Sequence, residues 1–341
     1  MKVLILKPSS LGDVVHALPT VRALRRHRPE ARLHWFLNRE LAPLLEGDPD
    51  VERLIPFDRQ GWGRPLGWPE VWSTLRQLRQ ARYDVILDLQ SLARTALIGW
   101  VARGGMVIGL DDPREGAPAW HDVSIPRPSW DTHAVDWLRA TLGPLGLPDE
   151  PVRVEGWLPR RESVAAPLRA RWHSGGQTWI ALQPGARWMT KRWPVGYFAA
   201  VARELTALDP GIHVAVLGGR DDAALGAAIA GVAGPRVFDF TGKLTLPELV
   251  EWLRMTTCLV TNDTGPMHLA VAVGTPVVAL FGPTAPERTG PYGRGADVLR
   301  GTAPCAPCLR DSCRQAEPLA CLQSIPPARV LAAVRRHLPA R

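Results

Sequence analysis

The sequence predicts an α/β protein with two Rossmann-like halves, each a parallel β-sheet covered by helices. Short apolar runs of strand length alternate with stretches of helical periodicity along the chain, which is the pattern of βαβ units. A chain of 341 residues that is 46% apolar exceeds one average domain and can bury two cores. Prolines interrupt both periodicities between about residues 146 and 171, so we expect one domain over residues 1–160 and a second over 161–341.

The N-terminal half contains three strand and helix pairs. Residues 3–6 form a short apolar run that predicts the first strand, and apolar positions at helical spacing over 14–26 predict the helix after it. The same alternation gives a strand over 32–36 with a helix near residue 41, and a strand over 85–89 with a helix over 93–101. Pairs in this order predict a parallel sheet.

The C-terminal half repeats the alternation. Its predicted strands cover residues 179–182, 213–217, 237–238, 258–260 and 276–281. Its predicted helices cover 197–208, 223–230, 246–255 and 267–273. A final amphipathic helix over 328–337 is expected to pack back on the N-terminal domain.

The charge is moderately positive and dispersed. The chain has 41 Lys and Arg against 33 Asp and Glu, a net charge of +8, and the arginines are spread through predicted helices without a dense run. This gives little support to nucleic-acid binding and suits anionic substrates or an anionic membrane surface. The first apolar run is too short for a signal peptide, and no run approaches the roughly 18 residues of a membrane span. We expect a cytoplasmic protein that contacts a membrane at its surface.

The segment after the predicted strand 258–260 carries polar groups at the carboxyl end of a strand, where open α/β sheets bind ligands. Asp263 and Thr264 offer side-chain oxygens, and Gly265 permits close backbone approach. The N-terminus of the next helix suits a phosphate or diphosphate. The alternative is an Asp that caps an ordinary turn, and His268 one helical turn later is equally consistent with a packed core residue.

Two further loops follow strands. In residues 7–13 the carboxylate of Asp13 stands at the mouth of the first helix and can accept a proton from a hydroxyl, although an N-cap role explains it equally. In residues 183–194 three cations precede a helix, and Lys191 can pair with a diphosphate as a compact point charge. The alternative for such cations is simple solvation.

These loops together resemble glycosyltransferase family nine, the ADP-heptose:lipopolysaccharide heptosyltransferases. The motifs occur in the family's order nearly end to end: residues 9–16, Lys191-Arg192-Trp193-Pro194, Asp263-Thr264-Gly265 with His268, residues 281–284 and residues 290–293. Residues 7–18, 85–90, 114–115 and 133–135 most resemble the heptosyltransferase I branch, which adds the first heptose to a Kdo residue of the inner core.

The resemblance implies a GT-B fold, with two Rossmann-like domains facing a central cleft. The N-terminal domain would bind the acceptor and the C-terminal domain ADP-heptose. Asp13 matches the general base of an inverting transfer, and Lys191 with the Thr264–Gly265 backbone would hold the diphosphate. Asp263 would bind heptose hydroxyls. Catalysis in such an enzyme requires no metal or other cofactor, because cations and a helix dipole replace Mg²⁺ at the diphosphate.

Other ligand contacts carry over from the same resemblance. Asp221 occupies the ribose position, with Asp222 as an equal alternative, and Leu244 the position against adenine; a surface Asp and a core Leu are the simpler explanation. Ala186 and Arg187 replace hydroxyl residues that precede the loop lysine, which shifts phosphate contacts to Arg187 or Thr190. The predicted acceptor-binding residues are Lys7, Ser9, Ser10, Gly12, Arg59, Arg64, Arg114 and His133. Residues 57–64 contain fewer cations than the family's acceptor segment, which leaves the acceptor open.

Four cysteines lie close together near the C-terminus. Cys305, Cys308, Cys313 and Cys321 begin with a CxxC pair and could wrap one tetrahedral zinc or iron ion in a structural role. Reduced free thiols and disulfides are the alternatives. The fifth, Cys258, lies in a core strand and is expected to be a small buried hydrophobe.

The chain also has 14 tryptophans, of which Trp62, Trp68 and Trp72 lie in the acceptor-side segment. They suit a lipid or membrane interface, and core packing explains them equally.

The resemblance therefore implies inverting transfer of heptose from ADP-L-glycero-D-manno-heptose to Kdo-lipid A or a related inner-core sugar. The enzyme would be peripheral at the cytoplasmic face of the inner membrane of a Gram-negative bacterium, without a nucleic-acid partner. Alternatives are a heptosyltransferase for a later core heptose or another glycan or protein, and a non-catalytic nucleotide-sugar-binding protein.

Overall fold

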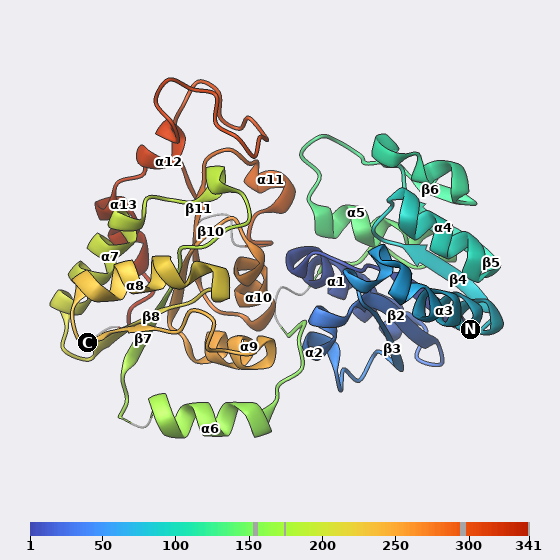
Figure 1. Ribbon diagram of the computed structural model, residues 1–341, viewed down its shortest axis with the longest axis horizontal. Helices are drawn as coiled ribbons and strands as arrows, with labels where there is room; N and C mark the ends of the chain where they lie inside the picture. Colours follow the sequence, from blue (N-terminus) through green and yellow to red (C-terminus); the bar gives the residue numbers. More distant parts are fainter. Residues whose placement is uncertain (153–155, 174, 294–297, 340–341) are drawn as a thin grey trace. The chain divides into compact units, whose positions relative to one another are not determined.

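A computed structural model (Figure 1) describes residues 1–152, 156–173, 175–293 and 298–339. Contacts divide the chain into two compact units. The N-terminal unit holds residues 1–152 and Trp157–Pro159, and the C-terminal unit consists mainly of the residues from Arg160 onward.

The N-terminal unit is built on a six-stranded parallel sheet with the strand order β3-β2-β1-β4-β5-β6. Its strands are β1 (Lys2–Leu6), β2 (Arg32–Asn38), β3 (Arg53–Phe57), β4 (Tyr83–Asp88), β5 (Arg103–Leu110) and β6 (Val123–Ile125). Its α-helices are α1 (Leu11–His27), α2 (Ala42–Leu45), α3 (Trp68–Gln80), α4 (Ala93–Ala102) and α5 (Ala134–Ala140).

The C-terminal unit repeats this plan with the order β12-β11-β10-β7-β8-β9, again parallel. Its strands are β7 (Thr178–Gln183), β8 (Ile212–Val216), β9 (Val237–Asp239), β10 (Cys258–Asn262), β11 (Val277–Phe281) and β12 (Val298–Arg300). Its helices are α6 (Glu162–Trp172), α7 (Val195–Leu208), α8 (Ala223–Ala233), α9 (Leu246–Met255), α10 (Gly265–Val273), α11 (Pro286–Thr289), α12 (Ala320–Gln323) and α13 (Pro327–Arg335).

The central strands are covered on both faces. Every residue of β10 and β11 is buried, as expected for a parallel sheet between two helical layers. The final helix α13 packs on α7 and against β10 and β11, with Val330 and Val334 in the core of the C-terminal unit. The predicted contact of α13 with the N-terminal domain stays a prediction.

The predicted α/β alternation is confirmed, with differences at the element ends. Helix α1 begins at Leu11 rather than Val14, because Ser10 and Asp13 form a capping box at its start. The pattern of apolar residues did not predict β3, β5, β6, β12, α3, α5, α6 or the short helices α11 and α12. Edge strand β3 contains exposed Pro56, and β5 begins with Arg-Gly-Gly, so neither has a strand-like apolar pattern.

None of the helices in the described segments combines the length and apolar character needed to cross a bilayer.

Candidate active site

The first group of polar side chains lies where β1 and β4 end in the N-terminal unit. These strands are neighbours in the parallel sheet, so the loops after them meet at one edge. Lys7 follows β1 and is buried, and its Nζ donates to the carbonyl of Leu89, 2.7 Å away, just after β4. Asp13, half-buried in the first turn of α1, accepts hydrogen bonds at Oδ2 from the backbone N–H (2.8 Å) and the hydroxyl (2.7 Å) of Ser10. We call Lys7, Ser10 and Asp13 the N-terminal cluster.

The charge of Lys7 is tied to its surroundings. Burial lowers the pKa of the Lys7 side chain, and the nearby carboxylates of Asp13 and Asp88 offset only part of that lowering. The cluster is therefore a buried amino group with two carboxylates nearby at the end of a sheet. Such a site can orient a hydroxylated, anionic ligand and offers a carboxylate that can accept its proton.

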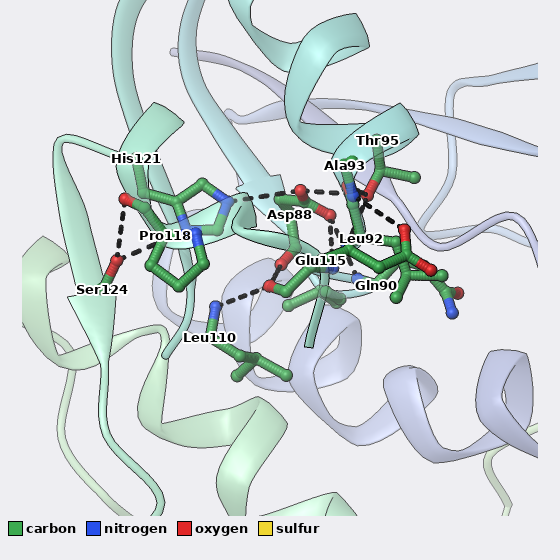
Figure 2. Close-up of polar contacts among 12 residues, drawn as sticks. Asp88, Gln90, Leu92, Ala93, Thr95, Leu110, Glu115, Pro118, His121 and Ser124 are labelled. Carbon is green, nitrogen blue, oxygen red and sulfur yellow. Dashed lines mark hydrogen bonds and ion pairs between the residues drawn. The ribbon is translucent and has the colours of Figure 1, made fainter. Parts of the chain in front are cut away.

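A buried network fixes the loop that receives Lys7 (Figure 2). Asp88 ends β4, and its Oδ1 accepts from the backbone N–H of Ser91 at 2.8 Å. Its Oδ2 lies 3.3 Å from Nε2 of His121, and both of these side chains are fully buried. The other ring nitrogen of His121 lies 3.4 Å from the hydroxyl of Ser124 in β6.

In this Asp–His–Ser chain the side chains of Asp88 and His121 are fully buried and Ser124 is half-buried. This network joins the loop after β4 to β5 and β6. Gly109 of β5 leaves the space for the histidine ring, since a Cβ there would stand 2.1 Å from Cε1 of His121. The network therefore positions the carbonyl of Leu89 for Lys7.

The second group lies at the carboxyl edge of the C-terminal sheet. The neighbouring strands β7, β10 and β11 each contribute one residue from the loop that follows. Nζ of Lys191 pairs with Oδ2 of Asp263 at 2.7 Å, and the hydroxyl of Thr284 donates to the same oxygen at 2.8 Å. The ring of Trp188 lies beneath the ammonium, with its centroid 4.6 Å from Nζ. We call Lys191, Asp263 and Thr284 the C-terminal cluster.

The start of α10 adjoins this cluster. Thr264 is the N-cap residue of α10, so the first backbone N–H groups of the helix follow Asp263 directly. Buried Asn262 fastens the lysine loop to β10, because its Oδ1 accepts from the N–H of Trp193 (3.1 Å) and its Nδ2 donates to the carbonyl of Pro184 (2.7 Å). A cation beside a helix N-terminus is a place for a diphosphate.

A comparison with known protein families identifies the chain. The model of glycosyltransferase family 9 (heptosyltransferase) matches residues 71–318, well over half of the sequence. The chain belongs to glycosyltransferase family 9.

The relatives agree with this assignment. Lipopolysaccharide heptosyltransferase 1 of Pseudomonas aeruginosa is 29% identical over 325 residues, which cover 92% of this chain and 87% of the relative. Lipopolysaccharide heptosyltransferase 2 of Escherichia coli K12 is 28% identical over 320 residues and 88% of each chain. The structure of the E. coli ADP-heptose lipopolysaccharide heptosyltransferase II has a TM-score of 0.78 at 24% identity and covers 99% of this chain and 98% of that one.

The chain is thus a glycosyltransferase of the heptosyltransferase family with the GT-B fold, as the sequence predicted. The roles of its individual site residues stay predictions. The positions of these residues in the structure are as follows. Asp13 is not itself the N-cap of α1: Ser10 is the N-cap, and Asp13 at the third helical position completes a capping box with it. The role of Asp13 as a base stays a prediction. Gly12 is buried in the same turn, and Ser9 is partly buried before it.

Other predicted acceptor residues have partners of their own. The guanidinium of Arg114 pairs with Asp112 at 2.6 Å. Nδ1 of His133 accepts from the N–H of Val135 at the start of α5, and its ring contacts that of His16. Arg59 and Arg64 are exposed on the segment between β3 and α3.

The predicted nucleoside residues divide into exposed and anchored ones. Asp221 is exposed and Leu244 partly buried. Asp222 accepts from the N–H of Gly219 at 3.0 Å and lies against Gly185, so it holds two loops of this edge together. Arg187 is exposed, whereas the buried Thr190 donates its hydroxyl to the carbonyl of Arg310 at 2.8 Å. His268 is buried within α10.

The cysteine segment lies next to this loop in space. Besides the bond from Thr190, the N–H of Leu309 donates to the carbonyl of Pro283 at 2.7 Å, one residue before Thr284. Cys305, Cys308 and Cys313 line a hollow of about 340 Å³, and Cys321 is buried. All are free thiols.

Backbone N–H groups of residues 314, 315 and 319 lower the pKa of the Cys313 thiol, and burial raises that of Cys321. Across the described residues, no group of three or more His, Cys, Asp or Glu side chains is placed to hold one metal ion. The structural zinc or iron site stays a prediction.

Sequence reasoning assigned no role to Thr284, Asn262 or the Asp88–His121 pair. Thr284 follows a strand end within the motif at 281–284, which is a usable signal, and Asn262 directly precedes Asp263. His121 and Asp88 are 33 residues apart, and only the pairing of β4, β5 and β6 brings them together.

Proposed function

We propose that this enzyme transfers L-glycero-D-manno-heptose from ADP-heptose to a Kdo residue of Kdo-lipid A, with inversion at the anomeric carbon. The observation that carries the proposal is the C-terminal cluster, in which Lys191 and the N-terminus of α10 meet at the carboxyl edge of the sheet. This arrangement suits the diphosphate of a nucleotide sugar. A solved E. coli relative, heptosyltransferase WaaC with ADP, has the same fold, with a TM-score of 0.78 and 23% identity.

In the proposed reaction Asp13 takes the proton of the acceptor hydroxyl, whose oxygen attacks the anomeric carbon of the donor. The bond from that carbon to the β-phosphate oxygen of ADP breaks as the new glycosidic bond forms. Lys191 and the first N–H groups of α10 stabilise the negative charge that develops on ADP. Lys191 is held by Asp263 in the structure, so donor binding exchanges part of this ion pair for contacts with phosphate.

A second acceptor has specific support. The 28% identity with lipopolysaccharide heptosyltransferase 2 over 88% of the chain is close to the 29% with heptosyltransferase 1. A heptosylated inner core is therefore the competing acceptor. Because acceptors of either kind are carried by a membrane, the proposal includes a peripheral position at the cytoplasmic face of the inner membrane.

The test is ADP release from ADP-heptose with Kdo₂-lipid A, with a heptosylated Kdo₂-lipid A, or with no acceptor, all in EDTA. We expect release with Kdo₂-lipid A alone among the three. Release only with the heptosylated lipid would replace the acceptor, and donor binding without release on any acceptor would contradict the transfer itself.

A further inference from the structure

One face of the N-terminal unit exposes large apolar side chains on elements that are neighbours in space. They are Trp68 and Trp72 of α3 (59% and 69% exposed), Leu97 and Trp100 of α4 (both 48%) and Trp120 of the 3₁₀ turn Ala117–Trp120 (43%). Helix α3 packs against α4 (Figure 1). Helix α4 also packs against that turn. The rings of Trp100 and Trp120 meet edge to face, with centroids 5.9 Å apart. We call these five residues the aromatic surface.

The aromatic surface lies mainly on the outer sides of α3 and α4, and the inner sides of these helices pack in the core of the unit. Trp68 and Trp72 are four residues apart and Leu97 and Trp100 three apart, so each pair lies on one side of its helix. The core cluster beneath the sheet-facing sides includes Leu78 of α3 and Ile98 of α4. The exposed tryptophans are therefore additional to those needed for folding, and apolar groups gathered on a surface mark an interaction site.

Basic residues accompany the tryptophans. Helices α3 and α4 carry three arginines, Arg76, Arg79 and Arg94, all exposed, against a single acid. That acid, Glu70, pairs with Arg39 at 2.7 Å. At the end of α3, Arg79 and Arg82 also line a hollow of about 630 Å³ together with Asp84. The surface is thus apolar and cationic at once.

We propose that the aromatic surface docks on an anionic phospholipid bilayer. Tryptophan favours the boundary between headgroups and acyl chains, because its ring is apolar and its N–H is polar. Arginine side chains beside it reach lipid phosphates, and each basic residue near an anionic surface adds attraction that salt weakens. The inference deepens the proposed function, on which it rests in one respect: a lipid-borne acceptor gives the enzyme a reason to lie on the bilayer.

The experiment measures co-sedimentation of the full chain with vesicles of phosphatidylglycerol and phosphatidylcholine, and with phosphatidylcholine vesicles alone. We compare the wild type with Trp68→Ser/Trp72→Ser, in which both side chains are mostly exposed and their loss leaves the core intact. Trp130→Ser is the matched control. Trp130 is 54% exposed, and the segment between β6 and α5 that contains it leads away from α3 and α4 (Figure 1). Circular dichroism checks the fold of each variant.

We expect binding to anionic vesicles that weakens in high salt, a loss of about tenfold or more in the double variant, and no loss in Trp130→Ser. Quenching of tryptophan fluorescence by brominated lipid should fall in the double variant. The proposal is overturned if the wild type does not bind anionic vesicles, if the double variant binds as tightly, or if the control loses as much. A wild-type dimer that the double variant dissociates, without vesicle binding, would assign this surface to a second copy.

Transfer assays keep this proposal separate from the proposed function. With a water-soluble Kdo oligosaccharide as acceptor, the double variant should turn over like the wild type, because none of its changes is in either cluster. With Kdo₂-lipid A in vesicles it should be slower. Vesicle binding without transfer to any acceptor would contradict the proposed function and support the docking surface. Transfer without vesicle binding would support the proposed function and contradict the docking surface.

Discussion

Both units carry a six-stranded parallel sheet with polar loops at its carboxyl edge, but they differ in tryptophan exposure: the N-terminal unit buries Trp35 and Trp157 and exposes others, whereas the C-terminal unit exposes none of those described. The N-terminal unit exposes five tryptophans, at positions 68, 72, 100, 120 and 130. In the C-terminal unit Trp179, Trp193 and Trp252 are buried, and Trp172 and Trp188 are partly buried. There the rings of Trp172, Trp179 and Trp252 meet one another edge to face, with centroids 5.3 to 6.3 Å apart.

The polar clusters at the carboxyl edges of the two sheets also differ in how closed they are. The C-terminal cluster is closed on itself, since Lys191, Asp263 and Thr284 share one carboxylate oxygen and Asn262 anchors the loop behind them. In the N-terminal cluster the bonds of Asp13 to Ser10 are local, and Ser10 is exposed. This difference fits the proposed function, in which one sheet binds a small anionic donor and the other a larger acceptor. The following predictions test this contrast, from the largest effect to the smallest.

The largest effect is expected at the N-terminal edge. Asp13→Asn keeps the size of the side chain and an oxygen that can accept from Ser10, but removes the base. Transfer should fall by about 10²- to 10⁴-fold, while ADP-heptose binding, which the proposed function assigns to the other unit, should not change. Initial rates and calorimetric titration of the donor measure the two quantities. Glu30→Gln, an exposed acid just after α1, is the control. Near-normal turnover of Asp13→Asn would refute the assignment of the base.

At the C-terminal edge, Lys191→Met should lower kcat by about 10²- to 10³-fold, because charge on the departing ADP loses its closest cation. Lys191→Arg should recover part of the rate. Arg335→Met, which removes an exposed cation from α13, should have no effect. If Lys191→Met raised KM alone and left kcat intact, the lysine would bind the donor without stabilising the leaving group.

Much of this contrast can be predicted from the sequence, and part cannot. The alternation of apolar runs indicates both sheets, and polar loops after strands 3–6, 179–182 and 258–260 locate Asp13, Lys191 and Asp263. Whether a tryptophan is buried or exposed depends on which side of its helix faces the sheet. Helix α3 was missed, so Trp68 and Trp72 had no assigned face. The pairing of Lys191 with Asp263, 72 residues later, depends on β7 lying beside β10.

Glycine substitutions test how tightly each edge is packed. Alanine at Gly109 would place Cβ 2.1 Å from the fully buried ring of His121, and alanine at Gly185 would place it 2.3 Å from the carboxylate of Asp222. We expect Gly109→Ala to lower the free energy of unfolding by about 1–3 kcal/mol. Gly185→Ala should cost less, because the partly exposed Asp222 can move. Gly143→Ala, with no atom within 4 Å, is the control in thermal or urea unfolding. Equal costs at Gly109 and Gly143 would contradict the described packing of His121.

The smallest effect is expected on the pH dependence of stability, to which both units contribute. Burial lowers the pKa of His34 in β2 and of His173 after α6, so both favour the neutral form in the folded protein. The unfolded chain takes up protons below pH about 6.5 and the folded chain only at lower pH, so stability should fall as the pH drops from 7 to 5. The slope of Tm against pH should be smaller in His34→Gln and in His173→Gln. Unchanged slopes in both variants would exclude these histidines as its source.

The measurement that tests the central claim most directly is ADP release by the purified chain from ADP-heptose, with and without Kdo₂-lipid A, in EDTA, for the wild type and Asp13→Asn. The account predicts release that requires the acceptor, survives the chelator and is lost in the variant, with one heptose added to the lipid by mass spectrometry. Release that ignores the acceptor, or that persists in Asp13→Asn, would contradict it.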